Sequence, residues 1–196
     1  MARYDREHKA ATRQRIIETA ARRLKREGVE RSGIVGLMAD VGLTNGAFYA
    51  HFASKDDLVA TVVADQLSRQ RDRTSAGMTS IADFRDFVRD YLSPEHRDHT
   101  EEGCPSAAML EDIGRSADVV REAYTAGMVA MIDDFATLLG EPDHRVAKAR
   151  ALSIFAAMTG VLQVSRVVTD EALARDVLQQ GVANTLALLD VLVPSS

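Results

Sequence analysis

Residues 32–58 read SGIVGLMADVGLTNGAFYAHFASKDDL and predict three helices joined by very short turns. Ser32 is suited to cap the first of these, and Gly42 ends it because glycine readily adopts the left-handed backbone of a tight turn. Thr44 is suited to cap the next helix, and Ser54 the one after it. The stretch is therefore a compact helical unit that follows an earlier helix.

Apolar side chains divide this unit into an inner and an outer side. The helix after Ser32 has an inward face of Ile34, Leu37, Met38 and Val41. In the helix over 45–51, Phe48 and Phe52 lie four residues apart and anchor one side. The residues left on its other faces are Thr44, Asn45, Ala47, Tyr49 and His51. This arrangement predicts a helix-turn-helix, in which one helix braces the next against the major groove.

The same residues carry a dense, ungapped motif, G-x-T-x-G-x-F-Y-x-H-F-x-S-K-x-x-L, over residues 42–58. In this the chain resembles the tetracycline-repressor (TetR) family of transcriptional regulators. The matching residues are Gly42, Thr44, Gly46, Phe48, Tyr49, His51, Phe52, Ser54, Lys55 and Leu58. Asn45 departs from the pattern, because many relatives have a lysine there.

The resemblance implies a set of DNA contacts. Ser32 and Gly33 would approach a backbone phosphate at the start of a helix, where free amides favour an anion. Thr44, Asn45 and Ala47 would face the groove, with Asn45 suited to a base edge and Gly46 allowing close approach. The remaining contacts, to phosphates, would come from Tyr49, His51 and Lys55.

Charge is distributed unevenly along the chain. The whole protein has a net charge of −5, which by itself argues against nucleic acid. Residues 1–55, however, hold 11 Lys and Arg against 6 Asp and Glu, a net +5, whereas residues 56–196 hold 13 against 23, a net −10. A basic end on an acidic body suits a protein that presents that end to phosphates.

The rest of the chain predicts further helices and no strand. A first helix is expected over 12–27, and body helices over 81–92, 105–115, 117–139, 143–168 and 171–193, with a polar loop over 93–103. We therefore expect an all-α protein of about nine helices. Residues 1–55 form the expected helix-turn-helix domain, and residues 56–196 an effector-binding and dimerisation domain.

The family resemblance implies a homodimer formed by the last two helices, as a palindromic operator requires. Their apolar stripes are Ala147, Ala151, Ile154, Phe155, Met158 and Val161, then Val177, Gly181, Asn184, Leu188 and Val191. These stripes can form a four-helix interface or instead face the core of the monomer.

It also implies a small-molecule effector pocket among the middle helices, and a repressor that the effector releases from DNA. The candidate lining residues are Phe84, Phe87, Tyr91, Cys104, Met109, Ile113, Tyr124, Met128, Met131 and Met158. Methionine adapts to irregular apolar ligands. The sequence does not identify the effector.

The single cysteine, Cys104, precedes Pro105 and is expected at a helix N-terminus, where amides stabilise a thiolate. Some relatives carry a cysteine at a corresponding helix start and respond to electrophiles or oxidants. The alternatives are a small buried residue or, less well matched in spacing, a metal site with His96 and His99.

Other classes of protein find little support. No apolar run matches a signal peptide or membrane span, so we expect a cytoplasmic protein. No phosphate-binding glycine loop, H-E-x-x-H or nucleophile elbow is present, and no motif calls for a cofactor. A helical enzyme and an adaptor dimer that does not bind DNA are the alternatives.

Overall fold

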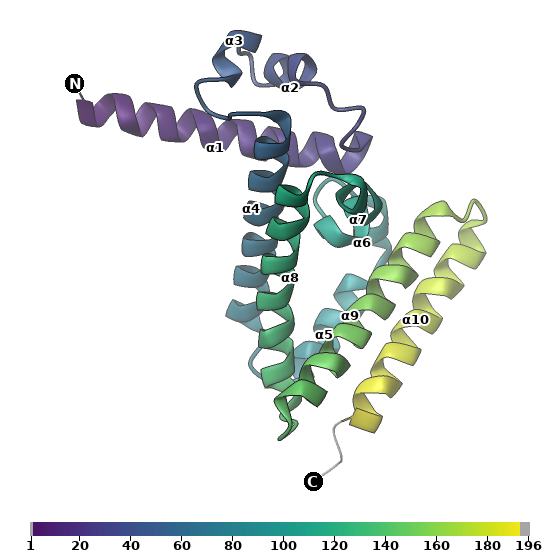
Figure 1. The fold of residues 1–196 in the computed structure, drawn as a ribbon. Coiled ribbons are helices and arrows are strands. Elements are labelled where there is room, and N and C mark those ends of the chain that lie inside the picture. Colours follow the sequence, from purple (N-terminus) through teal and green to yellow (C-terminus); the bar gives the residue numbers. More distant parts are fainter. Residues whose placement is uncertain (1, 193–196) are drawn as a thin grey trace.

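The computed structural model describes residues 2–192, and all regular structure in that range is helical (Figure 1). The ten helices are α1 (Ala2–Glu27), α2 (Ile34–Asp40), α3 (Asn45–Phe48), α4 (Lys55–Gly77), α5 (Ile81–Tyr91), α6 (Pro94–Asp98), α7 (Pro105–Arg115), α8 (Asp118–Leu139), α9 (His144–Val167) and α10 (Glu171–Leu192). The expected all-α fold is confirmed.

Two helix predictions need correction. The expected loop over 93–103 contains α6, which makes ten helices across the described residues instead of about nine. Ser93 caps α6 by accepting from the His96 amide at 3.2 Å, and Pro94 occupies its first turn, where the missing amide is not needed. The first helix also begins at Ala2 rather than Thr12. The expected end of the last helix, Val193, lies outside the described residues.

Helices α1–α3 form the head of the molecule, with α1 lying across the end of the other helices (Figure 1). Ile16, Ala20 and Leu24 are buried at helical spacing along α1, so this one face builds the core of the head. The same hydrophobic cluster continues into Val62 of α4 and Met109 of α7. The head therefore packs on the body through a shared core, and the boundary after residue 55 stays a prediction.

The body is built on α4 and α8, which lie side by side and run in the same direction (Figure 1). A Cβ at Gly127 of α8 would meet Leu67 of α4 at 2.8 Å, so glycine allows this close approach. A second core cluster lies farther from the head, where Phe84 of α5 packs against Phe135 of α8 with ring centroids 5.0 Å apart. Helix α8 ends at Gly140, whose φ of +64° confirms the expected stop.

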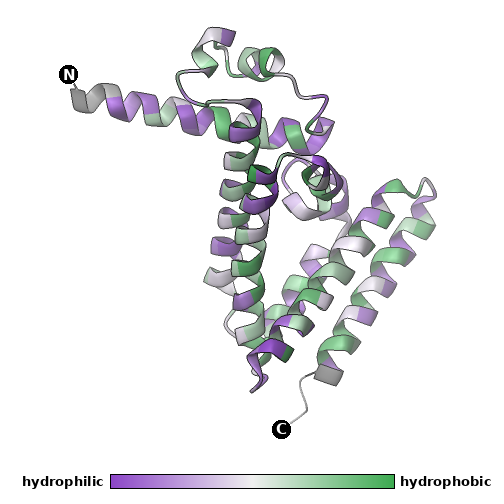
Figure 2. Cartoon of the chain, viewed as in Figure 1, coloured by the Kyte–Doolittle hydropathy of each residue, from purple (hydrophilic) through white to green (hydrophobic). Residues whose placement is uncertain are grey.

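Helices α9 and α10 form a hairpin on the side of the body away from α4 (Figure 1). Hydrophobic and hydrophilic residues alternate along both (Figure 2). At their closest, a Cβ on Gly181 would meet Val161 Cγ1 at 2.4 Å. The inward face holds much of the expected dimer stripe: Ala147, Ala151, Ile154, Phe155 and Met158 are buried in the protomer's own core.

The outward face of the hairpin is also apolar. Its large exposed residues are Leu152, Val164, Val167, Leu173 and Leu188. Of the expected interface residues, Leu188 and Asn184 are exposed, whereas Gly181 is buried and the side chain of Val191 lies outside the described part. In residues 2–192 we find no helix with the length and apolarity needed to cross a bilayer.

Candidate DNA-binding and effector sites

The turn between α2 and α3 is held mainly by backbone hydrogen bonds, and Arg15 of α1 also donates to Val41 O at 3.2 Å. Gly42 has a φ of +73°, as expected for a residue in the left-handed region. Its amide donates to Ala39 O, and the Leu43 amide donates to Met38 O, each at 2.9 Å. This pair of bonds is a Schellman motif, which satisfies carbonyls at the end of α2. The chain then enters α3 through Thr44, whose side chain makes no capping bond.

Phe48 holds α3 on the head. It is fully buried, and its ring packs edge-on against Tyr49 at 5.2 Å and against Phe52 at 5.7 Å. With this face buried, Thr44, Asn45, Gly46 and Tyr49 are exposed, and Ala47 is partly exposed. Tyr49 keeps 64% of its surface accessible. The structure therefore brings together on α3 the side chains expected to face the groove.

His51 and Lys55 flank this surface. His51 is partly buried, and its Nδ1 has no hydrogen-bond partner within residues 6–190. Burial, followed by the positive charges of Lys9 and Arg13 on α1, lowers the pKa of His51. Lys55 begins α4 behind the cap of Ser54, which accepts from the Asp57 amide at 3.1 Å as expected for a cap. Sequence reasoning missed Lys9, although the basic excess of residues 1–55 pointed to this part of the chain.

Ser32 has a different position from the one expected. It is fully buried, and its hydroxyl donates to Gly28 O at 2.8 Å, so it closes the turn after α1. Gly33 takes the N-cap position of α2 instead, with an exposed backbone. The hydroxyl of Ser32 is thus occupied inside the head, while a phosphate contact at Gly33 stays a prediction.

Gly36, an unfavourable residue within a helix, has a packing reason. A Cβ there would meet the Arg23 guanidinium at 2.9 Å. Arg23 in turn pairs with Asp40 of α2 at 2.6 Å and with Glu27 at 2.9 Å. Glycine therefore makes room for the ion pairs that connect α1 to the bracing helix.

A cavity of about 550 Å³ lies between α4, α5, α6 and the turn before α7. Three of the ten expected effector contacts line it: Phe87, Tyr91 and Cys104. The structure places the others in or against the core instead, because their apolar stripes are the ones that pack helix on helix. These are Phe84, Met109, Ile113, Tyr124, Met128, Met131 and Met158.

Cys104 is buried at the N-cap of α7, and Pro105 is its first helical residue, as expected. The Cys104 amide donates to His96 Nε2 at 3.0 Å, and His96 Nδ1 lies 2.7 Å from Tyr91 O. Because an amide only donates and a carbonyl only accepts, His96 is the neutral tautomer protonated on Nδ1. Burial accordingly lowers its pKa. Both ring nitrogens are occupied, and no three candidate metal ligands gather anywhere in the described chain.

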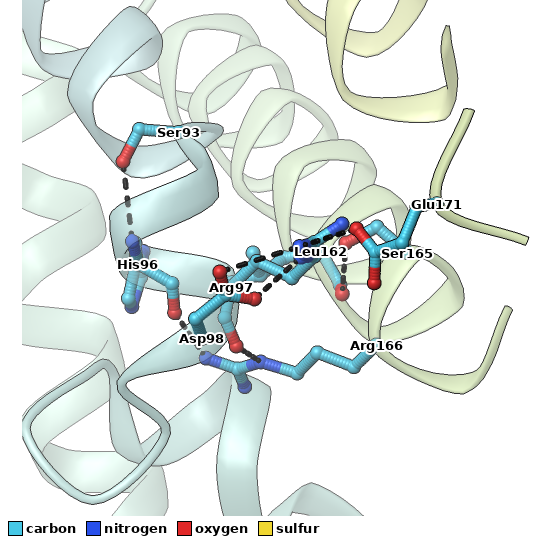
Figure 3. Close-up of polar contacts among 8 residues, drawn as sticks. All are labelled: Ser93, His96, Arg97, Asp98, Leu162, Ser165, Arg166 and Glu171. Carbon is cyan, nitrogen blue, oxygen red and sulfur yellow. Dashed lines mark hydrogen bonds and ion pairs between the residues drawn. The ribbon is translucent and has the colours of Figure 1, made fainter. Parts of the chain in front are cut away.

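One buried and one partly buried cation support this turn. Lys25 of α1 donates to Gly103 O at 2.9 Å, and burial lowers its pKa to about 8 despite the nearby acidic side chains of Glu101 and Glu102. Arg166 of α9 donates to the carbonyls of His96, Arg97 and Ala107 at 2.7, 3.1 and 3.2 Å, and Figure 3 shows the first two of these bonds. Sequence reasoning missed both residues, because nothing local distinguishes them from other helix-surface cations.

Comparison with known proteins finds a family match in the first part of the chain. Residues 16–62 match the family model of bacterial regulatory proteins of the tetR family. They span the whole helix-turn-helix and the start of α4. This segment of the chain is similar to the tetR family of bacterial regulatory proteins.

Solved structures extend the likeness in fold to the body. The E. coli protein NemR in its reduced form superposes with a TM-score of 0.78 at 16% identity, covering 95% of this chain and 100% of that one. A TetR-family regulator from Agrobacterium tumefaciens gives 0.72 at 18% identity, covering 90% and 98%. At identities this low, the superpositions show a common fold and nothing finer. No curated protein sequence matches the chain.

Proposed function

We propose that this chain is a transcriptional repressor that dimerises on a palindromic operator and leaves it when a small molecule occupies the body. The observation that carries the proposal is the surface of α3, where Thr44, Asn45 and Tyr49 are exposed together above the buried Phe48. Tyr49 and Lys55 would contact phosphates and set the register, and Asn45 would read a base edge. Lys9 and Arg13 add positive charge beside His51.

Dimerisation would use the outward face of the α9–α10 hairpin. Leu152, Val164 and Val167 of α9, with Leu173 and Leu188 of α10, are large apolar side chains exposed on the single chain. Burying them against a second copy removes apolar surface from water, which favours association. Two heads joined in this way would meet successive major grooves of a palindromic site.

The cavity would hold the effector, because its walls lead to the head by two routes. Helix α4 connects the head directly to the cavity wall, and Lys25 connects α1 to the turn at Gly103. A ligand that fits one arrangement of these elements better than the other shifts the dimer toward it. The dimer leaves the operator if, in the arrangement that the ligand favours, the distance between the two heads no longer matches the two half-sites.

Cys104 would let the same cavity respond to electrophiles. It lies at the cavity wall, next to Gly103, whose carbonyl oxygen accepts a hydrogen bond from Lys25. The thiolate is the form of cysteine that reacts with electrophiles. In an addition to a maleimide, the sulfur forms a bond to one alkene carbon and the thiol proton ends on the other. A purely structural role for this buried residue is the alternative.

The first test is binding of the purified protein to the DNA upstream of its own gene, compared with a scrambled sequence, over a range of salt concentrations. We expect a sequence-selective complex whose affinity falls steeply with salt. Asn45→Ala should reduce the preference for the operator by about 1–3 kcal/mol while leaving binding to scrambled DNA unchanged. Equal binding to both sequences by the folded dimer would contradict the proposal.

The cysteine is tested separately with N-ethylmaleimide. We expect mass spectrometry to find one adduct per chain, and operator affinity to fall on its formation. Cys104→Ser should neither take up the reagent nor lose affinity on treatment. A wild-type protein that is modified in full yet binds the operator unchanged would show that Cys104 has a packing role.

A further inference from the structure

We infer that the cavity between α4 and α5 takes an organic cation, a molecule with an ammonium group on an aromatic or apolar body. The inference rests on the proposed effector role of this cavity and names the class of compound that would fill it. Three independent features of the wall support it: an unsatisfied buried acceptor, a negative charge balance, and two aromatic rings.

The unsatisfied acceptor is the side-chain carbonyl of Gln70. Gln70 lines the cavity from α4 and is only 6% exposed. Its Oε1 is fully shielded and has no hydrogen-bond partner in the described part of the chain. A buried polar atom without a partner is unfavourable, so such an atom on a cavity wall indicates a missing donor. A ligand with N–H groups supplies that donor once the Gln70 side chain turns its Oε1 toward the cavity.

The charges on the wall favour a positive ligand. Asp90 of α5 and Glu102 before α7 line the cavity, and neither carboxylate makes a hydrogen bond or ion pair among residues 6–190. Two further carboxylates on the wall are engaged, Asp86 with Arg89 at 2.6 Å and Asp83 in the cap of α5. The described lining contains a single cation, Arg73, so the wall is net negative.

The other nearby cations are directed elsewhere. Lys25 bonds to Gly103 O, and Arg166 bonds to three carbonyls behind the turn, so neither ammonium nor guanidinium lines the cavity. His96 is neutral because its Nε2 accepts a hydrogen bond from the Cys104 amide and so carries no proton. Arg73 is thus the cation on the described wall, and no ion pair joins it to Asp90 or Glu102 within residues 6–190.

Aromatic and apolar groups form the rest of the site. Phe87 and Tyr91 stand on successive turns of α5 with centroids 5.7 Å apart, and Met78 closes the end of α4. The Tyr91 hydroxyl shares a 3.3 Å hydrogen bond with Thr159, and burial keeps its pKa well above its usual value, so the ring is neutral. Aromatic faces attract ammonium groups, and a cavity of this volume suits a drug-sized molecule.

The test uses three dansyl compounds of matched size: dansylcadaverine, which is a cation, the neutral N-pentyl dansylamide, and the anionic dansyl-6-aminohexanoate. The protein contains no Trp, so dansyl emission is measured without interference from indole. We expect dansylcadaverine to bind at least about tenfold more tightly than the neutral compound, and the anion to bind most weakly. Equal affinities, a preference for the anion, or no binding by any of the three would overturn the inference.

Variants locate the binding in the cavity. Asp90→Asn with Glu102→Gln should lower dansylcadaverine affinity by about tenfold and leave the neutral compound unaffected. Arg73→Gln should raise the affinity for dansylcadaverine, and Gln70→Leu should lower it. The matched control is Glu122→Gln, which removes an exposed carboxylate on α8 outside this cavity. If Gln70→Leu fails to fold, the Asp90 and Glu102 variants still test the inference. Both residues are exposed, so replacing them should leave the fold intact. A loss with the control as large as with the acid pair would also overturn the inference.

Failure of the inference and failure of the proposed function give different results, because dye binding needs no DNA. If dansylcadaverine binds in the expected order but leaves the operator complex intact, the ligand class holds and effector release fails. If the protein binds its operator and another compound releases it, while the three dyes show no preference for the cation, the inference fails alone.

Discussion

The ammonium group of Lys25 in α1 donates a 2.9 Å hydrogen bond to the carbonyl oxygen of Gly103, the residue before Cys104. The helix that underlies the head is thereby joined directly to the wall of the cavity. A second bond nearby, from the Val29 amide to Asp112 Oδ2 at 3.1 Å, joins the end of α1 to α7. Movement of the turn before α7 would therefore act on the head through α1 as well as through α4.

Lys25 should make the free energy of unfolding depend on pH. Its pKa is lowered from 10.5 to about 8 by burial, so the unfolded chain binds more protons than the folded one between these values. The cost of burying its charge is absent above pH 10.5 and is present in full once the pH has fallen below about 8. A tenfold change in proton affinity corresponds to about 1.4 kcal/mol, so the whole effect is on the order of 3 kcal/mol.

Urea unfolding of the wild type and Lys25→Met from neutral pH to above pH 10 measures this contribution. The difference between the two curves isolates Lys25 from other groups that titrate in the range. We expect the wild type to gain stability relative to Lys25→Met as the pH rises. Parallel curves would mean that the Lys25 ammonium is solvated in the folded protein.

Lys55→Gln should weaken operator binding and also binding to unrelated DNA, because a phosphate contact carries no sequence information. The slope of log affinity against log salt concentration should fall by about 1 for each head. Fluorescence anisotropy at several salt concentrations measures both effects. Lys148→Gln, a charge removal on α9, is the control and should leave the slope unchanged. An unaltered slope in Lys55→Gln would place this residue off the DNA.

Phe48→Ala and Tyr49→Ala should separate stability from DNA contact at neighbouring positions. Phe48 is fully buried, so its truncation should destabilise the protein by about 3–5 kcal/mol. Tyr49 is 64% exposed and packs only the edge of its ring, so its truncation should remain below about 1.5 kcal/mol. Urea unfolding gives both values. Tyr49→Ala should nevertheless lose operator affinity, and retention of full affinity would remove it from the DNA surface.

Val164→Glu should disrupt the dimer. Val164 is 50% exposed on the outward face of α9, and a two-fold interface there would bury two added carboxylates. We expect dimer affinity to fall at least about tenfold, measured by analytical ultracentrifugation. Val119→Glu is the matched control, because Val119 is 49% exposed on α8. A dimer that tolerates Val164→Glu must use another surface.

The helix-turn-helix could be derived from the sequence by itself because its signals are local. The left-handed turn at Gly42, the cap at Ser54 and the spacing of Phe48 and Phe52 act within a few residues of one another, where backbone geometry leaves few choices. The capping prediction at Ser32 was wrong because its hydroxyl bonds back to Gly28 O across the turn after α1. The hydrogen-bond partner of the Ser32 hydroxyl thus lies before it in the sequence, and not in the helix that follows.

Only the tertiary structure decided which apolar stripe faces the core and which polar residues gather at the cavity. Periodicity shows that a helix has an apolar face but not what that face packs against. The sequence therefore left Phe155 and Met158 to a dimer interface or to the protomer core, and the structure places them in the core. Likewise the cavity-lining residues Gln70, Asp90 and Cys104 lie on α4, on α5 and just before α7, which are distant in sequence. The physical reason is that packing depends on the shapes of all the helices together, whereas capping and turn formation depend on near neighbours.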